Sequence, residues 1–201
     1  MKRAIQPVVV IIAFAVATAG VARAAAPPFE PFEAAAAGFT IGIPKDWAPF
    51  DLSKETQAGV QRALKRTGAE HPDELAAIVP TLRAQGGVLY AVDPKQHDGL
   101  NANLNVVRGP LLNRTITDFD QALRAPFKNL KAKAPKIAPV EIDGVAGRKA
   151  AGRVKVGDTN VLLEQVIVPV GDKYLQFTLS LRPGAASKRL AGTLIKSIDL
   201  A

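Results

Sequence analysis

The chain has 201 residues, a net charge of +8 and no cysteine, and 48% of its residues are hydrophobic. This length allows one domain with a good core, which must be stable without disulfides or thiolate metal sites. The positive charge suits an acidic protein, an anionic envelope polymer or anionic lipid headgroups as partners, whereas the few scattered aromatic residues argue against nucleic acid.

The first 24 residues have the three-part layout of a secretory signal peptide. Lys2 and Arg3 precede an uncharged apolar run, and Ala22-Arg23-Ala24 places small residues at the two positions that a signal peptidase reads. We therefore predict an exported protein, periplasmic or secreted, with cleavage after Ala24. The alternative is an uncleaved anchor, because the uncharged run is marginally long enough to span a bilayer. Only in that case do we expect contact with the membrane.

Residues 25–38 are rich in proline and alanine and show no clear period. We interpret them as a flexible leader, followed by a single domain over residues 39–201. The domain opens with a strand in which Phe39, Ile41 and Ile43 alternate with small or polar residues. Pro44 ends this strand, since proline cannot donate to a ladder of hydrogen bonds.

Helical and strand patterns follow one another along the rest of the chain. Helices are expected between residues 53 and 68, between 72 and 85 with a break near Pro80, at 115–133 and at 185–198. Further strands are expected at 88–92, 100–107, 137–142, 145–156, 160–169 and 173–181. Short glycine-containing joints between the last four predict antiparallel hairpins.

The strand expected at 100–107 carries an asparagine at every second position. Alternate side chains of a strand share a face, so Asn101, Asn103 and Asn105 place three amides on one side of the sheet. We expect this face to be solvated or polar. It could recognise a glycan or a peptide, or it could be an exposed face without a ligand.

The order of these elements, together with two short motifs, resembles the PsbP-like group. The motifs are Phe39-Thr-Ile-Gly-Ile-Pro-Lys-Asp-Trp47 and Ile142-Asp-Gly-Val-Ala-Gly-Arg-Lys-Ala150. The group includes PsbP of photosystem II, the Ran-binding Mog proteins and the LpqN-type exported proteins of actinobacteria. The resemblance implies an α+β fold, an α/β/α sandwich in which an antiparallel sheet of about six strands is flanked by helices. It also implies a non-enzymatic protein that binds partners.

No residue pattern indicates catalysis or a cofactor. His71 and His97, with Asp93 or Asp98, would make a weak zinc ligand set, and we favour exposed loop histidines. No serine lies in a Gly-x-Ser-x-Gly turn, and no glycine-rich loop leads from a strand into a helix. We therefore predict a protein that is not an enzyme and that needs neither metal nor cofactor.

Basic residues gather in two regions and define a candidate partner-binding face. Its members are Lys128, Lys131, Lys133, Lys136, Arg148, Lys149, Arg153 and Lys155. The alternative is a scattered, solvated set of charges. Together with the export signal, this face suggests a non-catalytic binding or scaffold module of the bacterial cell envelope, with an envelope protein or an anionic polymer as partner. A small-molecule or lipid carrier is the alternative function, and a hydrolase is less favoured.

Overall fold

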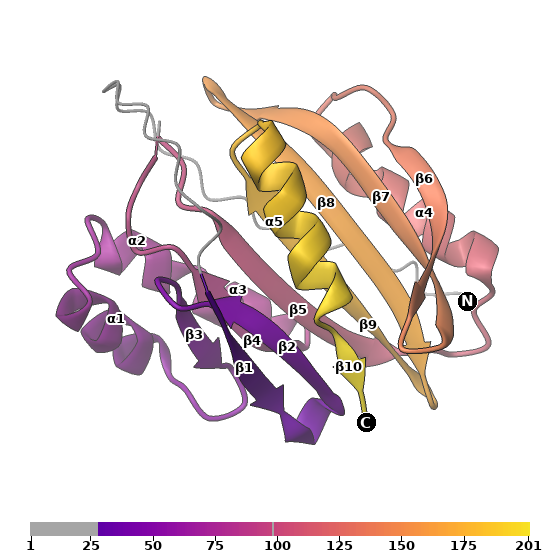
Figure 1. The fold of residues 1–201 in the computed structure, drawn as a ribbon, viewed down its shortest axis with the longest axis horizontal. Coiled ribbons are helices and arrows are strands. Elements are labelled where there is room, and N and C mark those ends of the chain that lie inside the picture. Colours follow the sequence, from indigo (N-terminus) through magenta and orange to yellow (C-terminus); the bar gives the residue numbers. More distant parts are fainter. Residues whose placement is uncertain (1–27, 98) are drawn as a thin grey trace.

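The computed structural model describes residues 28–97 and 99–201, and it has the predicted α+β fold (Figure 1). The strands are β1 (Phe29–Ala34), β2 (Phe39–Pro44), β3 (Ala48–Asp51), β4 (Gly87–Val92), β5 (Asn103–Pro110), β6 (Lys136–Ile142), β7 (Val145–Val156), β8 (Thr159–Val170), β9 (Lys173–Leu181) and β10 (Asp199–Leu200). The helices are α1 (Gln57–Arg66), α2 (Pro72–Ala77), α3 (Val79–Ala84), α4 (Ile116–Asn129) and α5 (Ala185–Lys196), with a 3-10 turn, η1, at Ala35–Ala37.

The strands form two antiparallel sheets. In the described residues, a main sheet of seven strands has the order β3-β4-β5-β9-β8-β7-β6, and a small sheet of three strands has the order β1-β2-β10. The predicted meander from β6 to β9 is confirmed, and positive φ angles at Gly144, Gly157 and Gly171 supply the left-handed backbone of its tight turns. Pairing of β5 with β9 then joins this meander to the earlier strands.

One face of the main sheet carries the largest apolar cluster. Alternate residues of β5, β8 and β9 pack there against α5 and the small sheet (Figure 1). Phe39 of β2 meets Phe177 of β9 edge to face, with the ring centroids 5.3 Å apart. Trp47 is buried in the same cluster.

The opposite face carries two separate apolar clusters. The first packs α1, α2 and α3 over β3 and β4, and the second packs α4 over β7 and β8. Helices therefore flank both faces of the main sheet, which confirms the predicted sandwich. Among the described residues, no helix has the length and apolar character needed to cross a bilayer.

The flexible leader is the clearest error of the sequence interpretation. Residues 29–34 form β1, which pairs with β2 along its whole length, and residues 35–37 form η1. Phe29 and Phe32 pack against the main cluster, and this burial orders the segment despite its prolines. Pro31 is tolerated because β1 lies at the edge of its sheet. Residues 1–27, which include the predicted signal peptide, lie outside the described part of the chain.

Candidate functional site

Between the two helical clusters, and reaching into the first of them at Tyr90, the central strands carry buried polar side chains without charge. We call this group the polar strip. It consists of Tyr90 on β4, Asn103 and Asn105 on β5, Gln165 on β8, and Gln176, Thr178 and Ser180 on β9. Each of these residues is at most 3% exposed. The asparagine face was expected to be solvated or polar; it is polar, but it is buried.

The strand register brings the strip together. Tyr90 pairs with Asn105, Asn105 with Thr178, and Thr178 with Gln165, so one polar residue from each of four adjacent strands lies in a single row. Asn103 pairs with Ser180 in a neighbouring row. Strands lie about 4.8 Å apart, so the row extends roughly 14 Å across the sheet.

Asn101 lies just before β5 and supports the end of the strip. Its side-chain amide donates to the carbonyl oxygen of Asp93 at 3.0 Å. The main-chain carbonyl oxygen of Asn101 accepts a hydrogen bond from the side-chain amide of Asn103 at 3.1 Å. The structure therefore brings the three predicted asparagines to one region, with Asn101 outside the strand that was expected to contain it.

Most polar atoms of the strip have no hydrogen-bond partner in the described structure. The atoms without one are Tyr90 Oη, Asn103 Oδ1, Asn105 Oδ1 and Nδ2, Gln165 Oε1, Gln176 Nε2 and Ser180 Oγ. Within the strip, Gln165 Nε2 donates to Thr178 Oγ1 at 3.3 Å. A buried polar group left without a partner costs about 1–3 kcal/mol, so a concentration of them in one place requires an explanation.

The strip combines donors and acceptors but carries no charge. Burial raises the pKa of the Tyr90 phenol far above its ordinary value, so this group stays protonated and can donate. Asn105 offers one donor and one acceptor from the same amide. This chemistry suits a neutral polar ligand, because an ion would lose its hydration without gaining a counter-charge.

The predicted basic face is divided between the two sides of β7. Arg148 points toward α4, where its guanidinium forms two hydrogen bonds with Asp120 at 2.6 and 2.7 Å. Lys149, Arg153 and Lys155 occupy the alternate positions of the strand and therefore lie on the opposite face. Lys149 pairs there with Glu164, which is buried. Of the four lysines, Lys128 lies in the last turn of α4, Lys131 and Lys133 lie in the connection that follows, and Lys136 begins β6.

The described residues that were considered for zinc, His71, His97 and Asp93, are not brought together in one group. His97 Nε2 lies 3.5 Å from Asp93, while His71 precedes α2. Burial raises the pKa of the Asp93 carboxyl group, which also accepts a hydrogen bond from the Lys95 amide. In the described part of the chain, no three histidine or acidic residues are grouped to hold a metal ion. Asp98 lies outside the described residues.

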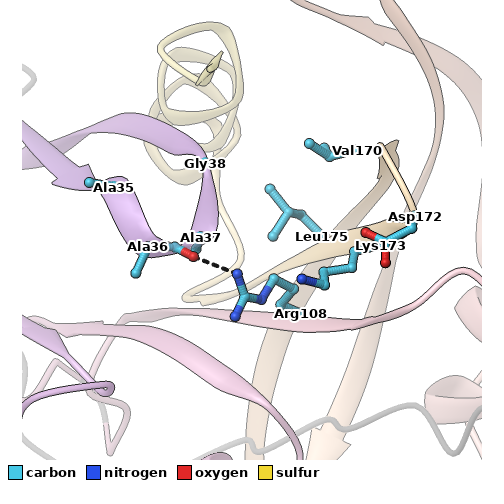
Figure 2. Close-up of a pocket in the computed structure, with 9 residues that line it drawn as sticks. All are labelled: Ala35, Ala36, Ala37, Gly38, Arg108, Val170, Asp172, Lys173 and Leu175. Atoms are coloured by element: carbon cyan, nitrogen blue, oxygen red, sulfur yellow. Dashed lines mark hydrogen bonds between the residues drawn. The ribbon is translucent and has the colours of Figure 1, made fainter.

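A surface pocket of about 260 Å³ opens on the face of the main sheet opposite the polar strip, between η1 and the start of β9 (Figure 2). Leu175 lines it together with three exposed or half-buried charged residues, Arg108, Asp172 and Lys173. The Arg108 guanidinium donates to the carbonyl oxygen of Ala36 and thereby ties η1 to β5. With mixed charges and a structural arginine, this pocket is a weaker candidate site than the polar strip.

Sequence reasoning identified the asparagine row but missed the β9 half of the strip. The alternation of Gln176, Thr178 and Ser180 with apolar residues is visible in the sequence. Their pairing with β5 depends on contacts between distant parts of the chain. A second polar row on another central strand was the signal that could have found the site.

Comparison with known proteins identifies the fold. No protein-family model and no curated protein matches the sequence. The solution structure of cyanobacterial PsbP (CyanoP) from Synechocystis sp. PCC 6803 matches with a TM-score of 0.56 and 15% identity, over 91% of this chain and 98% of that one. LpqN of Mycobacterium tuberculosis, described as involved in cell envelope biogenesis, matches with a TM-score of 0.50 and 11% identity, over 86% of this chain and 90% of that one. On this likeness, the protein has the PsbP-like fold that its sequence resembles.

Proposed function

We propose that the protein is an exported, non-catalytic binding module of the bacterial cell envelope, and that the polar strip is its binding site. The observation that carries the proposal is the set of buried, uncharged polar atoms without partners on the central strands. A core that served stability alone would place apolar side chains there, as the flanking positions Val92, Leu163 and Ile167 do. A ligand that supplied the missing hydrogen bonds would remove their cost, and because each strip residue is at most 3% exposed, it would reach them only when the residues that cover the strip move apart.

The chemistry of the strip supports binding rather than catalysis. General acid–base catalysis requires a group whose pKa lies near the working pH. The strip consists of amides, hydroxyl groups and the Tyr90 phenol, whose pKa burial raises. The nearby Lys149–Glu164 pair lies on the other face of the sheet, so it does not contribute an acid or base.

Two further observations support the envelope as the place of action. The N-terminal sequence predicts export, and the LpqN structure, described as involved in cell envelope biogenesis, shares the fold. An envelope protein is the proposed partner, and the split basic face remains a candidate second contact for an anionic partner. Neither role depends on a metal or a cofactor.

Affinity capture from envelope extracts tests the proposal. The protein is produced in an exporting bacterial host, and bound species are identified by mass spectrometry for the wild type and for two variants. Asn105→Leu removes the central amide of the strip, whereas Asn160→Leu alters an exposed asparagine on β8. We expect a ligand that is retained by the wild type and Asn160→Leu proteins and lost from Asn105→Leu. Equal recovery from all three proteins, or no bound species, would overturn the proposal.

A further inference from the structure

We infer that both sheets are closed to strand addition, so that neither a second copy of this chain nor an extended segment of another protein pairs with their edges. The inference goes beyond the proposed function and does not depend on the polar strip. In the described part of the chain, the edge strands are β3 and β6 of the main sheet and β1 and β10 of the small sheet. An edge strand exposes unpaired N–H and C=O groups, which are a template for another strand unless they are removed or covered.

Each of the three longer edge strands carries one exposed proline: Pro31 in β1, Pro49 in β3 and Pro139 in β6. Proline has no N–H, so it removes a donor from the free edge when its nitrogen faces outward. Alternate residues of a strand direct their main-chain groups to opposite sides. Gly42 faces Pro31 in the register but donates its amide to Ser197 Oγ at 2.9 Å, away from β1. The two residues are therefore not a hydrogen-bonded pair, and the nitrogen of Pro31 faces the free edge.

The nitrogens of Pro49 and Pro139 face outward as well. The Leu52 amide donates toward β4, to the carbonyl oxygen of Val88 at 3.1 Å, and Pro49 lies three positions before it, so its nitrogen has the opposite direction. Positive φ angles at both residues of Asp143-Gly144 give the turn between β6 and β7 the type I′ form, whose closing hydrogen bond directs the preceding residue toward β7. Pro139 lies three positions before that residue and is therefore directed to the free edge.

The fourth edge, β10, is covered by a side chain. The Ala201 amide donates to the carbonyl oxygen of Gly38 at 3.1 Å, so the Leu200 amide is directed away from β2. That amide donates to Asp143 Oδ2 at 3.1 Å. Asp143 lies in the turn between β6 and β7, so a turn of the main sheet closes the edge of the small sheet. Three edges thus lack an outward donor, and the outward donor of the fourth is occupied.

The proline has the largest effect on β6, which with seven residues is the longest of these edges. If two copies of β6 paired in antiparallel fashion about residue 139, Pro139 would face itself and both N–H groups of that pair would be missing. A different extended chain would lose one hydrogen bond at the same place, and its carbonyl oxygen opposite Pro139 would be left without a donor. Partners of this protein are therefore bound through side-chain surfaces rather than through an added strand.

Sedimentation equilibrium of the exported protein tests the inference. The wild type is compared with Pro139→Thr, with the triple variant Pro31→Thr/Pro49→Thr/Pro139→Thr, and with Pro80→Thr. Threonine restores the N–H and suits a strand, whereas Pro80 is exposed in the first turn of α3 and lies outside both sheets. We expect Pro139→Thr and the triple variant to self-associate at least about tenfold more tightly than the wild type, because they regain hydrogen bonds across the edge. Pro80→Thr should behave as the wild type does.

Hydrogen exchange at low and high protein concentration locates the contact. In Pro139→Thr, the amides of β6 should gain protection as the concentration rises, and in the wild type they should not. The inference is overturned if the wild type itself shows such protection at β6, if the variants stay as dispersed as the wild type, or if their association protects segments outside the edge strands. Should the triple variant not fold, Pro139→Thr alone decides. The capture experiment with Asn105→Leu tests the polar strip separately, so either proposal can fail without the other.

Discussion

At the scale of single residues, Asn105 combines complete burial with two unsatisfied polar atoms. We predict that Asn105→Leu stabilises the ligand-free protein by about 1–2 kcal/mol, because leucine has a similar size and no hydrogen bonds to lose. Urea unfolding of the two purified proteins measures the difference. Asn160→Leu, at an exposed site, should change stability by less than about 0.5 kcal/mol. A loss of stability in Asn105→Leu would show that the amide is satisfied in the free protein.

The buried pair of Lys149 and Glu164 leads to the opposite expectation. Glu164 is only 5% exposed, so loss of its cationic partner leaves a buried carboxylate without a counter-charge. We predict that Lys149→Met lowers the free energy of unfolding by about 3 kcal/mol, and that Lys149→Met combined with Glu164→Leu recovers most of it. Lys155→Met is the control, because the pair of Lys155 with Asp158 is exposed. If Lys149→Met is as mild as Lys155→Met, the pair contributes little.

This pair also changes how the predicted basic face should be tested. Lys149 and Arg148 each hold a carboxylate, so reversal of their charges would disturb the fold as well as any partner contact. Reversal at Lys128, in the last turn of α4, and at Lys131 and Lys133, in the connection from α4 to β6, is the cleaner test of an anionic partner.

At the scale of elements, Arg148 and Asp120 attach α4 to β7. Hydrogen bonds from Arg148 hold the pKa of the Asp120 carboxyl group below its usual value. The stabilisation is therefore complete above the unfolded pKa of about 3.9 and is lost as the pH falls through the lower folded value. We predict that Asp120→Asn costs about 1–2 kcal/mol near pH 7, and that the difference from the wild type shrinks below about pH 4.

Denaturant unfolding between pH 3 and pH 8 checks this prediction. Asp158→Asn, which alters an exposed pair, provides the matched control and should follow the wild type throughout. A difference between Asp120→Asn and the wild type that stays constant down to pH 3 would exclude the carboxylate as its cause.

Elements with strong local patterns were predictable from the sequence. The meander β6–β9, the strand β2 and the helices α4 and α5 follow from alternation, helical period and turn residues. Helix α1 begins later than expected, because Thr56 rather than Ser53 caps it by accepting a hydrogen bond from the Gly59 amide. Pro80 divides the second helical stretch into α2 and α3, as predicted.

The missed elements depend on partners that are distant in the chain. Strand β1 contains Pro31 and has no period of its own, and β10 is a two-residue strand that pairs with β2. Strand β3 likewise pairs with β4 only after the chain has passed through three helices. Their pairing comes from tertiary packing, which a local pattern does not contain.

At the scale of the whole molecule, a first prediction concerns the removal of the signal peptide that the sequence predicts. We predict that the protein recovered outside the cytoplasm begins at Ala25, because Ala22-Arg23-Ala24 fits a signal peptidase site. Intact-mass measurement and N-terminal sequencing of the exported protein check this. An Ala24→Phe variant should be processed poorly and remain associated with the membrane. Recovery of the wild type with residues 1–24 still attached would favour the anchor alternative.

The pairing of β5 with β9 has a kinetic consequence. Strands β6–β9 meet neighbours in the chain through short hairpins, whereas Asn105 meets Thr178 only when two distant parts of the chain close on each other. Contacts of such long sequence separation are costly to close, so we expect the polar strip to be assembled after the hairpins. A ligand would bind only chains that had completed this closure, and its binding energy would oppose reopening of the same seam. The site would thus distinguish finished molecules from partly folded ones, and the occupied protein would unfold more slowly than the free one.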